Sequence, residues 1–100
     1  MLTESEILEI ANSYILSIEK ESKIETVIIH TETIKKPYGN IFFYTSKKYY
    51  ETGDDKYAVA GNAPFLVENK SGNIIVFGTV YMEEYYIKEY EAGRWPLNNS

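Results

Sequence analysis

The sequence predicts an α+β fold in which a four-stranded antiparallel sheet is flanked by an N-terminal and a C-terminal helix. Apolar residues recur at helical spacing near both ends of the chain, whereas β-branched and aromatic residues concentrate between them. Short turn-forming segments separate those central runs, and short connections favour antiparallel neighbours. The expected order is therefore α-β-β-β-β-α. With 100 residues, the chain is expected to form one domain, residues 1–100, around a modest core.

The first helix is expected over residues 4 to 20. Thr3 and Glu6 have the spacing of a capping box, in which each side chain satisfies a free backbone N–H at the helix start. Behind them, apolar residues recur every three or four positions, as on one face of a helix: Ile7, Leu8, Ala11, Tyr14, Ile15 and Ile18. This face is expected to pack against the sheet.

Four strands are expected after this helix. Residues 25–36 are dense in threonine, valine and isoleucine, and residues 41–50 are apolar in both phases of a strand's alternation. The turn-forming cluster at 37–40 separates these two strands. The third and fourth strands form a hairpin, with Leu66 and Val67 in one strand and residues 74–77 in the other.

The hairpin carries its own turn chemistry. Gly72 closes the loop at 69–72 because glycine takes a positive φ without steric cost. Pro64 has no N–H to donate and therefore belongs at the start of its strand. We predict that Gly61, Asn62, Ala63 and Pro64 are structural and not catalytic.

The last helix is expected after residue 79. Thr79 is a plausible N-cap, and Gly93 is expected to stop the helix. The expected buried stripe consists of Met82, Tyr85, Tyr86 and Tyr90. Both helices are expected to cover one face of the sheet, leaving residues 94–100, with Trp95, as a short tail.

Composition excludes several classes of protein. A net charge of −5 argues against nucleic-acid binding, which needs a basic stripe to neutralise phosphates. The chain has no cysteine, so it can form neither a disulfide nor a cysteine-based zinc site. Residues 1–10 carry glutamates and no basic residue, unlike a secretory leader, and the apolar runs are far too short to span a membrane. We therefore expect a cytoplasmic protein.

The sequence predicts no catalytic, cofactor or metal site. His30 is the only histidine, and no motif places it beside a nucleophile and an orienting carboxylate. Glu51, Asp54 and Asp55 surround Gly53, but they lack the alternating oxygen ligands of a calcium loop. The glycines form no phosphate-binding motif. We expect that the protein is not an enzyme.

A partner-binding surface is the remaining hypothesis. Six aromatic and acidic residues cluster around the end of the second strand: Tyr44, Tyr49, Tyr50, Glu51, Asp54 and Asp55. Tyrosines can anchor an interface, while surrounding carboxylates steer a basic partner. In the competing interpretation, Tyr49 and Tyr50 alternate across a strand, so one packs under the helices. Residues 57–59 and Trp95 could equally close over the exposed aromatic area.

Several short segments together resemble a known family. These are E-T-G-D at 51–54, A-G-N-A-P-F-L-V at 60–67, a Ser-Gly turn, F-G-T at 77–79 and E-E-Y at 83–85. In this order they resemble the immunity protein 35 family, or YrhB-like domain, of bacterial polymorphic-toxin systems. The aromatic run I-F-F-Y at 41–44 also fits the family pattern. The stretch Val80-Tyr81-Met82 departs from it, because a small residue and a proline-leucine pair are expected there.

The resemblance implies a cytoplasmic protein that binds a cognate toxin domain and blocks it without catalysis. It supplies no residue-level toxin contacts. Some YrhB-like proteins are regarded as chaperone-like, so a domain that holds exposed apolar segments on its sheet face is the alternative. Self-association as a homodimer stays open.

Overall fold

The computed structural model describes residues 1–58 and 62–95. Within these ranges it contains helices and strands together, which confirms the α+β class. Two short 3-10 turns, η1 (His30–Glu32) and η2 (Asp55–Tyr57), interrupt the regular elements. The regular elements are α1 (Glu4–Ser22), β1 (Thr26–Ile28), β2 (Ile34–Lys36), β3 (Gly39–Phe42), β4 (Tyr44–Ser46), α2 (Lys47–Thr52), β5 (Phe65–Glu68), β6 (Ile74–Val76) and α3 (Glu83–Glu91).

The strands form two antiparallel sheets, so the expected single four-stranded sheet is wrong. One sheet has four strands in the order β2-β3-β5-β6, and the other pairs β1 with β4. The first predicted strand, 25–36, is divided by the turn η1, and the second, 41–50, is divided after Phe42. Beyond each break the chain changes partner: β2 and β3 pair with each other, whereas β4 returns to β1.

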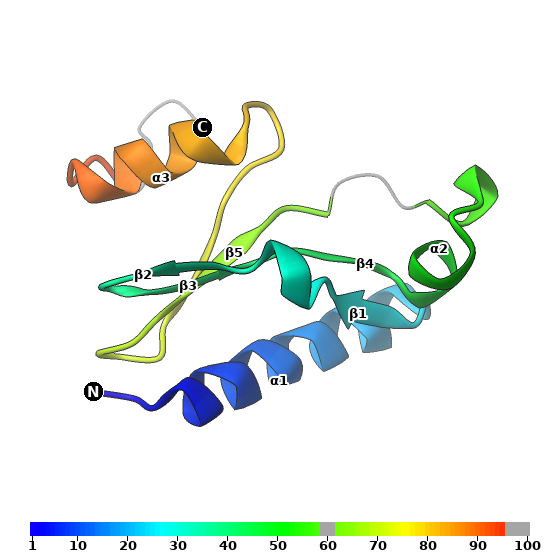
Figure 1. Ribbon diagram of the computed structural model, residues 1–100, viewed down its shortest axis with the longest axis horizontal. Helices are drawn as coiled ribbons and strands as arrows, with labels where there is room; N and C mark the ends of the chain where they lie inside the picture. The colour runs from blue at the N-terminus through cyan, green and yellow to red at the C-terminus, as the bar shows by residue number, and fades with distance from the viewer. Residues whose placement is uncertain (59–61, 96–100) are drawn as a thin grey trace.

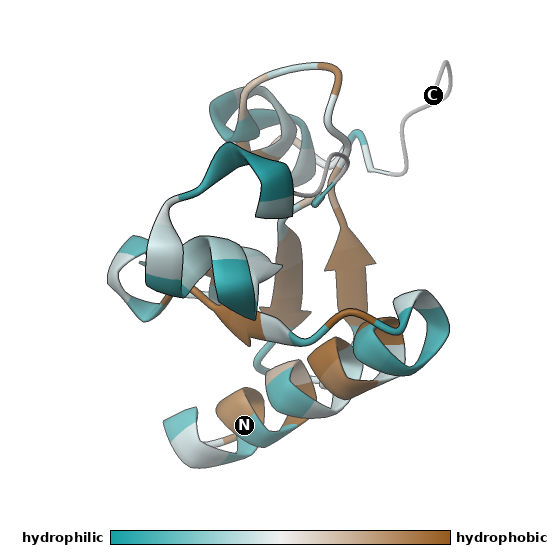
Figure 2. Ribbon diagram, turned by 90° about the vertical axis from the view of Figure 1, so that its right-hand side faces the viewer, coloured by the Kyte–Doolittle hydropathy of each residue, from teal (hydrophilic) through white to brown (hydrophobic). Residues whose placement is uncertain are grey.

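Helices cover both faces of the four-stranded sheet, not one face as expected (Figure 1). Helix α1 lies against one face, where Ile7, Ala11 and Ile15 pack in a cluster with Phe42 and Phe65. Helix α3 lies against the opposite face, where its buried residues pack with Ile41, Leu66 and Phe77. Figure 2 shows the hydrophobic strands between the two helices. Two-sided burial explains why residues 41–42 and 65–67 are apolar in both phases of alternation.

The predicted first helix and hairpin are confirmed. At the start of α1, Thr3 Oγ1 accepts from the N–H of Glu6 and Glu6 Oε1 accepts from the N–H of Thr3, which completes the capping box. Pro64 directly precedes β5, and its carbonyl accepts from the N–H of Phe77 at 2.9 Å. Gly72 has the expected positive φ, 75°. Gly61 lies outside the described residues.

Residues 47–52, predicted as the end of a strand, form the helix α2. Ser46 is its N-cap, and its Oγ accepts from the N–H of Tyr49 at 3.1 Å. The same hydroxyl donates to the carbonyl of Tyr57 at 2.6 Å, which ties α2 to η2. Gly53 ends the helix with φ 69°. A cap at each end stabilises this short helix despite its aromatic and lysine residues.

Helix α3 begins later than predicted. Its N-cap is Met82, which makes no side-chain cap bond, so Thr79 is not the cap. Tyr86 and Ile87 are the buried residues of the helix and Tyr90 is half-buried, whereas Met82 and Tyr85 are exposed. Gly93, with φ 77°, follows the last turn as predicted. Trp95 packs on the same cluster, with its ring centroid 5.4 Å from that of Phe77.

Two tyrosine–glutamate pairs fasten α3 to the sheet. The Tyr38 hydroxyl donates to Glu91 Oε2 at 2.7 Å, and the Tyr90 hydroxyl donates to Glu68 Oε2. Burial, and then the bond to Glu68, raises the pKa of Tyr90 to about 12. The rings of Tyr38 and Tyr90 lie 4.9 Å apart between centroids. The C-terminal helix is thus held by polar bonds at its edge as well as by its buried side chains.

Gly39 is required by the packing of β3 on β5. A Cβ at this position would lie 2.2 Å from the carbonyl oxygen of Val67, which belongs to a buried strand. We expect Gly39→Ala to lower the free energy of unfolding by about 3 kcal/mol or more, because backbone must shift. In the control Gly53→Ala, the added Cβ has no atom within 4 Å. This variant should lose only about 1 kcal/mol of unfolding free energy, because alanine must adopt the positive φ of this position. Equal losses in urea unfolding would contradict this account.

Tyr90→Phe tests the polar attachment of α3. At pH 7 the variant should lose about 1 kcal/mol of unfolding free energy, because the bond to Glu68 is removed. The folded pKa is raised to about 12, so the wild-type advantage is complete below the unfolded value of about 10 and is lost as pH rises toward 12. Urea unfolding of both proteins from pH 7 to 11.5 measures the difference. The role assigned to the Tyr90–Glu68 bond would be refuted if the stability difference between wild type and Tyr90→Phe did not change with pH. An equal difference for Tyr50→Phe, at an exposed tyrosine, would also refute it.

Candidate functional site

The structure brings together five of the six predicted partner-binding residues. Tyr49, Tyr50 and Glu51 belong to α2, and Asp54 and Asp55 follow directly at η2. We call residues 46–57 the α2–η2 segment. Tyr44 is not part of this surface: it lies in β4, packs against the core with its ring centroid 6.0 Å from that of Phe65, and has a pKa raised by burial.

The two adjacent tyrosines differ in exposure for a helical reason. Because α2 is a helix, consecutive side chains are turned by roughly 100° around its axis instead of pointing to opposite faces. Tyr50 is 56% exposed, whereas Tyr49 is half-buried. The expected alternation across a strand is therefore wrong. Tyr50 is therefore the exposed tyrosine of α2.

One acidic residue of the α2–η2 segment, Asp54, is paired with a lysine. Asp54 caps η2 by accepting from the N–H of Lys56 at 3.1 Å, and its carboxylate lies 3.8 Å from Lys56 Nζ. The ammonium groups of Lys48 and Lys56 both lie over the ring of Tyr57, at 5.2 and 5.1 Å from its centroid. Lys47, Lys48 and Lys56 therefore occupy the same segment as its three carboxylates.

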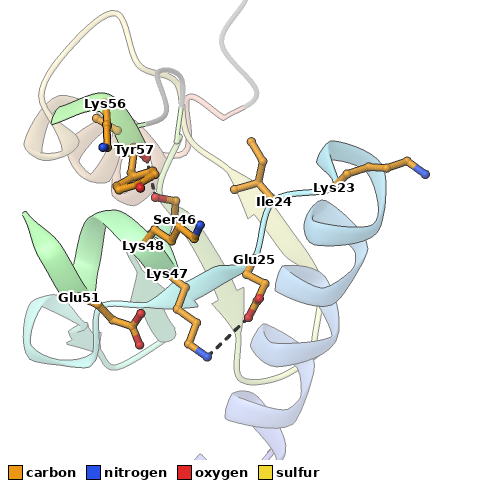
Figure 3. Close-up of a pocket in the computed structure, with 10 residues that line it drawn as sticks. Lys23, Ile24, Glu25, Ser46, Lys47, Lys48, Glu51, Lys56 and Tyr57 are labelled. Carbon is orange, nitrogen blue, oxygen red and sulfur yellow. Dashed lines mark hydrogen bonds and ion pairs between the residues drawn. The ribbon is translucent and has the colours of Figure 1, made fainter. Parts of the chain in front are cut away.

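A cavity of about 530 Å³ lies beside the α2–η2 segment (Figure 3). Its charged lining comprises four lysines and two glutamates, so it is basic within an acidic chain. Lys47 and Glu25 point toward one another, with 3.5 Å between Nζ and Oε2, while Lys23 points away from the other lining residues. The lining residues are Lys23, Ile24, Glu25, Ser46, Lys47, Lys48, Glu51, Lys56, Tyr57 and Ala58.

His30 is not in a strand as predicted but in the exposed turn η1. It lines a smaller cavity of about 250 Å³ together with Glu4. That carboxylate already accepts from Asn40 Nδ2 at 2.7 Å and pairs with Lys35 Nζ at 3.3 Å. The Asn40 bond, followed by Lys35, lowers the pKa of Glu4. Glu4 is thus engaged by partners other than the imidazole.

Grouped metal ligands and membrane-crossing helices are both absent from the described ranges. Residues 1–58 and 62–95 hold no group of three or more histidine, cysteine, aspartate or glutamate side chains placed to bind a metal ion. Across the same residues, none of the helices has both the length and the apolar character needed to cross a membrane.

An exposed apolar surface at the start of α3 was not predicted from the sequence. Val80, Tyr81 and Met82 project from the loop before this helix, and Tyr85 lies on its first turn. We call these four residues the 80–85 patch. Their sequence did contain a signal, because three apolar residues stand where a helix start usually carries a polar cap. The predicted buried stripe had instead placed Met82 and Tyr85 inside.

Comparison with known proteins identifies the family. A family model described as immunity protein 35 matches residues 6–93. One relative is the Escherichia coli (strain K12) protein described as "Uncharacterized protein YrhB", which is 40% identical over 53 residues, or 53% of this chain. The matched segment covers 56% of that relative's length. No solved structure matches the chain. Because the family model extends from the first turn of α1 to the end of α3, the chain belongs to the immunity protein 35 family.

Proposed function

We propose that this chain is a non-catalytic, cytoplasmic immunity protein that binds and neutralises a cognate bacterial toxin domain. The observation that carries the proposal is the match to the immunity protein 35 model over residues 6–93, which includes both helix–sheet clusters. An inhibitor of this kind acts by stoichiometric occlusion, so it needs a rigid surface complementary to the toxin and no reacting groups of its own.

The α2–η2 segment is one proposed contact surface. Caps at Ser46 and Gly53 hold α2, and the bond from Ser46 to the carbonyl of Tyr57 fixes η2 beside it. Tyr50 is the exposed aromatic anchor, with Glu51, Asp54 and Asp55 around it. A preformed surface binds with a smaller loss of conformational entropy than a flexible loop does.

Charge acts at two ranges in this proposal. The net charge of −5 attracts a basic toxin domain at long range, which raises the association rate and weakens with salt. Within the α2–η2 segment, the carboxylates of Asp54 and Asp55 add local steering of a basic partner, and the neighbouring lysines make pairwise contacts that set its orientation.

A chaperone-like domain, the alternative implied by the resemblance to YrhB-like proteins, is the second candidate. In the simplest form of this hypothesis, the protein would bind an apolar client segment on an open face of its sheet. Clusters under α1 and α3 occupy both faces of the four-stranded sheet, which counts against that form. A chaperone would bind many unrelated unfolded clients with similar affinity, whereas an immunity protein would bind one folded toxin domain tightly.

Co-expression tests the immunity function. The probe is obtained by sequencing the reading frames next to this gene and expressing any C-terminal toxin domain that they encode. We expect this chain to restore the growth of cells that express that domain, and the purified proteins to form a stable complex. Failure of both rescue and complex formation would reject the proposal. Equal binding to several unfolded, unrelated proteins would support the chaperone-like alternative instead.

A paired charge variant tests the α2–η2 segment. Asp54→Asn with Asp55→Lys retains an oxygen that can cap η2 but removes the carboxylate charges. We expect association with the toxin domain to slow about 10-fold at low salt, with little change in melting temperature. Glu9→Gln with Glu21→Lys makes the same charge change on exposed positions of α1 and serves as the control. Indistinguishable association rates for the two variants would remove this segment from the interface.

A further inference from the structure

The 80–85 patch concentrates apolar surface in a short stretch of chain. Val80, Tyr81, Met82 and Tyr85 are 80%, 57%, 71% and 40% exposed. Other exposed apolar residues of the described ranges, such as Leu16 and Ile24, occur singly along the chain. Single exposed apolar residues are ordinary, but a group of large ones marks a surface that a partner covers.

The patch is held in place from below. The buried Tyr86 accepts a hydrogen bond at its hydroxyl from the N–H of Tyr81, at 3.3 Å. Gly78 packs so closely on the same ring that a Cβ would lie 2.4 Å from the hydroxyl oxygen. Above this support, the ring of Tyr81 lies 4.4 Å from that of Tyr85. The exposed side chains therefore stand on a preformed base, which limits the entropy lost on binding.

The residue at the helix cap indicates that this surface is not optimised for folding. Met82 occupies the N-cap of α3, where serine, threonine, aspartate or asparagine would accept a free backbone N–H. Met82 makes no such bond, and its side chain is exposed rather than packed in the core. Neither capping nor core packing accounts for a methionine here, whereas contact with a partner does. Methionine adapts readily to an apolar recess.

Charge beside the patch selects the kind of partner. Glu83 and Glu84 lie in the first turn of α3, directly next to Met82. Within residues 1–58 and 62–95, neither carboxylate takes part in an ion pair. A symmetric contact between two copies would bring both pairs of carboxylates to the same interface, where they would repel. A partner with an apolar recess bordered by lysine or arginine complements both features.

We propose that the 80–85 patch is the energetic centre of the surface by which this chain binds its toxin domain. The toxin face is expected to carry an apolar recess bordered by basic residues, which receives Tyr81 and Met82. This inference rests on the proposed immunity function. In this arrangement the patch determines how slowly the complex dissociates, and the carboxylates of the α2–η2 segment influence how fast it forms.

Two variants test the assignment, with the toxin domain identified in the rescue experiment as the probe. Tyr81→Ala with Met82→Ala removes the apolar anchors and should weaken binding about 100-fold, mainly through faster dissociation. Leu16→Ala, on α1, removes an exposed leucine of similar size and should change the affinity less than twofold. Dissociation rates come from surface plasmon resonance, and melting temperatures show that all variants fold.

Met82→Ser separates a binding role from a structural one. Serine supplies the missing cap oxygen, so this variant should melt at a higher temperature than the wild type. It also removes an apolar contact, so it should bind the toxin domain at least about fivefold more weakly. A structural role for Met82 predicts that stability and affinity change in the same direction. Opposite changes in the two measurements support the proposal.

The outcomes distinguish this inference from the function on which it rests. If the wild-type chain neither binds nor neutralises the toxin domain, both proposals fail. If the wild type binds and the double variant and Met82→Ser bind equally well, only the assignment of the patch fails. Light scattering of the free chain tests the remaining possibility, which is that a second copy of this chain covers the patch. A wild-type dimer that Met82→Ser converts to a monomer would overturn the assignment to a toxin.

Discussion

Strands β3 and β5 are buried on both faces, and the rest of the described structure is arranged around that pairing. Phe42 and Phe65 pack under α1, while their neighbours Ile41 and Leu66 pack under α3. The strands approach so closely at Gly39 that a Cβ there would collide with the carbonyl oxygen of Val67. Because adjacent residues serve opposite faces, a register shift of one residue would exchange two well-packed clusters at once. Strong register specification allows three-residue strands at β2 and β6 to complete the sheet.

The parts predicted correctly from sequence are those specified by neighbouring residues. The capping box of Thr3 and Glu6 and the turn at Gly72 depend on local backbone geometry, and both are present. Residues 25–36 and 41–50 are each divided because their two halves pair with different strands. Local β-propensity does not predict such pairing between distant segments. Helix α2 was predictable in principle from Ser46 and Gly53, but the aromatic residues between them favoured a strand.

The candidate site shows the same division between local and tertiary information. The residues of the α2–η2 segment were grouped together because they are contiguous in sequence, whereas the structure places Tyr44 apart from them through its tertiary contact with Phe65. Exposure at the 80–85 patch depends on where α3 starts and how it is rotated. Tyr85 and Tyr86 are neighbours of identical chemistry, yet one is 40% exposed and the other 3%. Packing of Tyr86 against Phe77 and Gly78 distinguishes the two.

The proposed contact surface, the 80–85 patch, is separate from the buried core, and this separation affects how specificity can change. Val80, Tyr81 and Met82 lie outside both buried clusters, so their replacement removes little packing energy. The base beneath them, Gly78 and Tyr86, is constrained by direct contact and must be retained for the loop to keep its shape. A fixed base with freely variable side chains lets the fold keep its stability while its choice of partner changes. Residues 80–82, where a different family pattern was expected from the sequence, are exposed and lie outside both buried clusters.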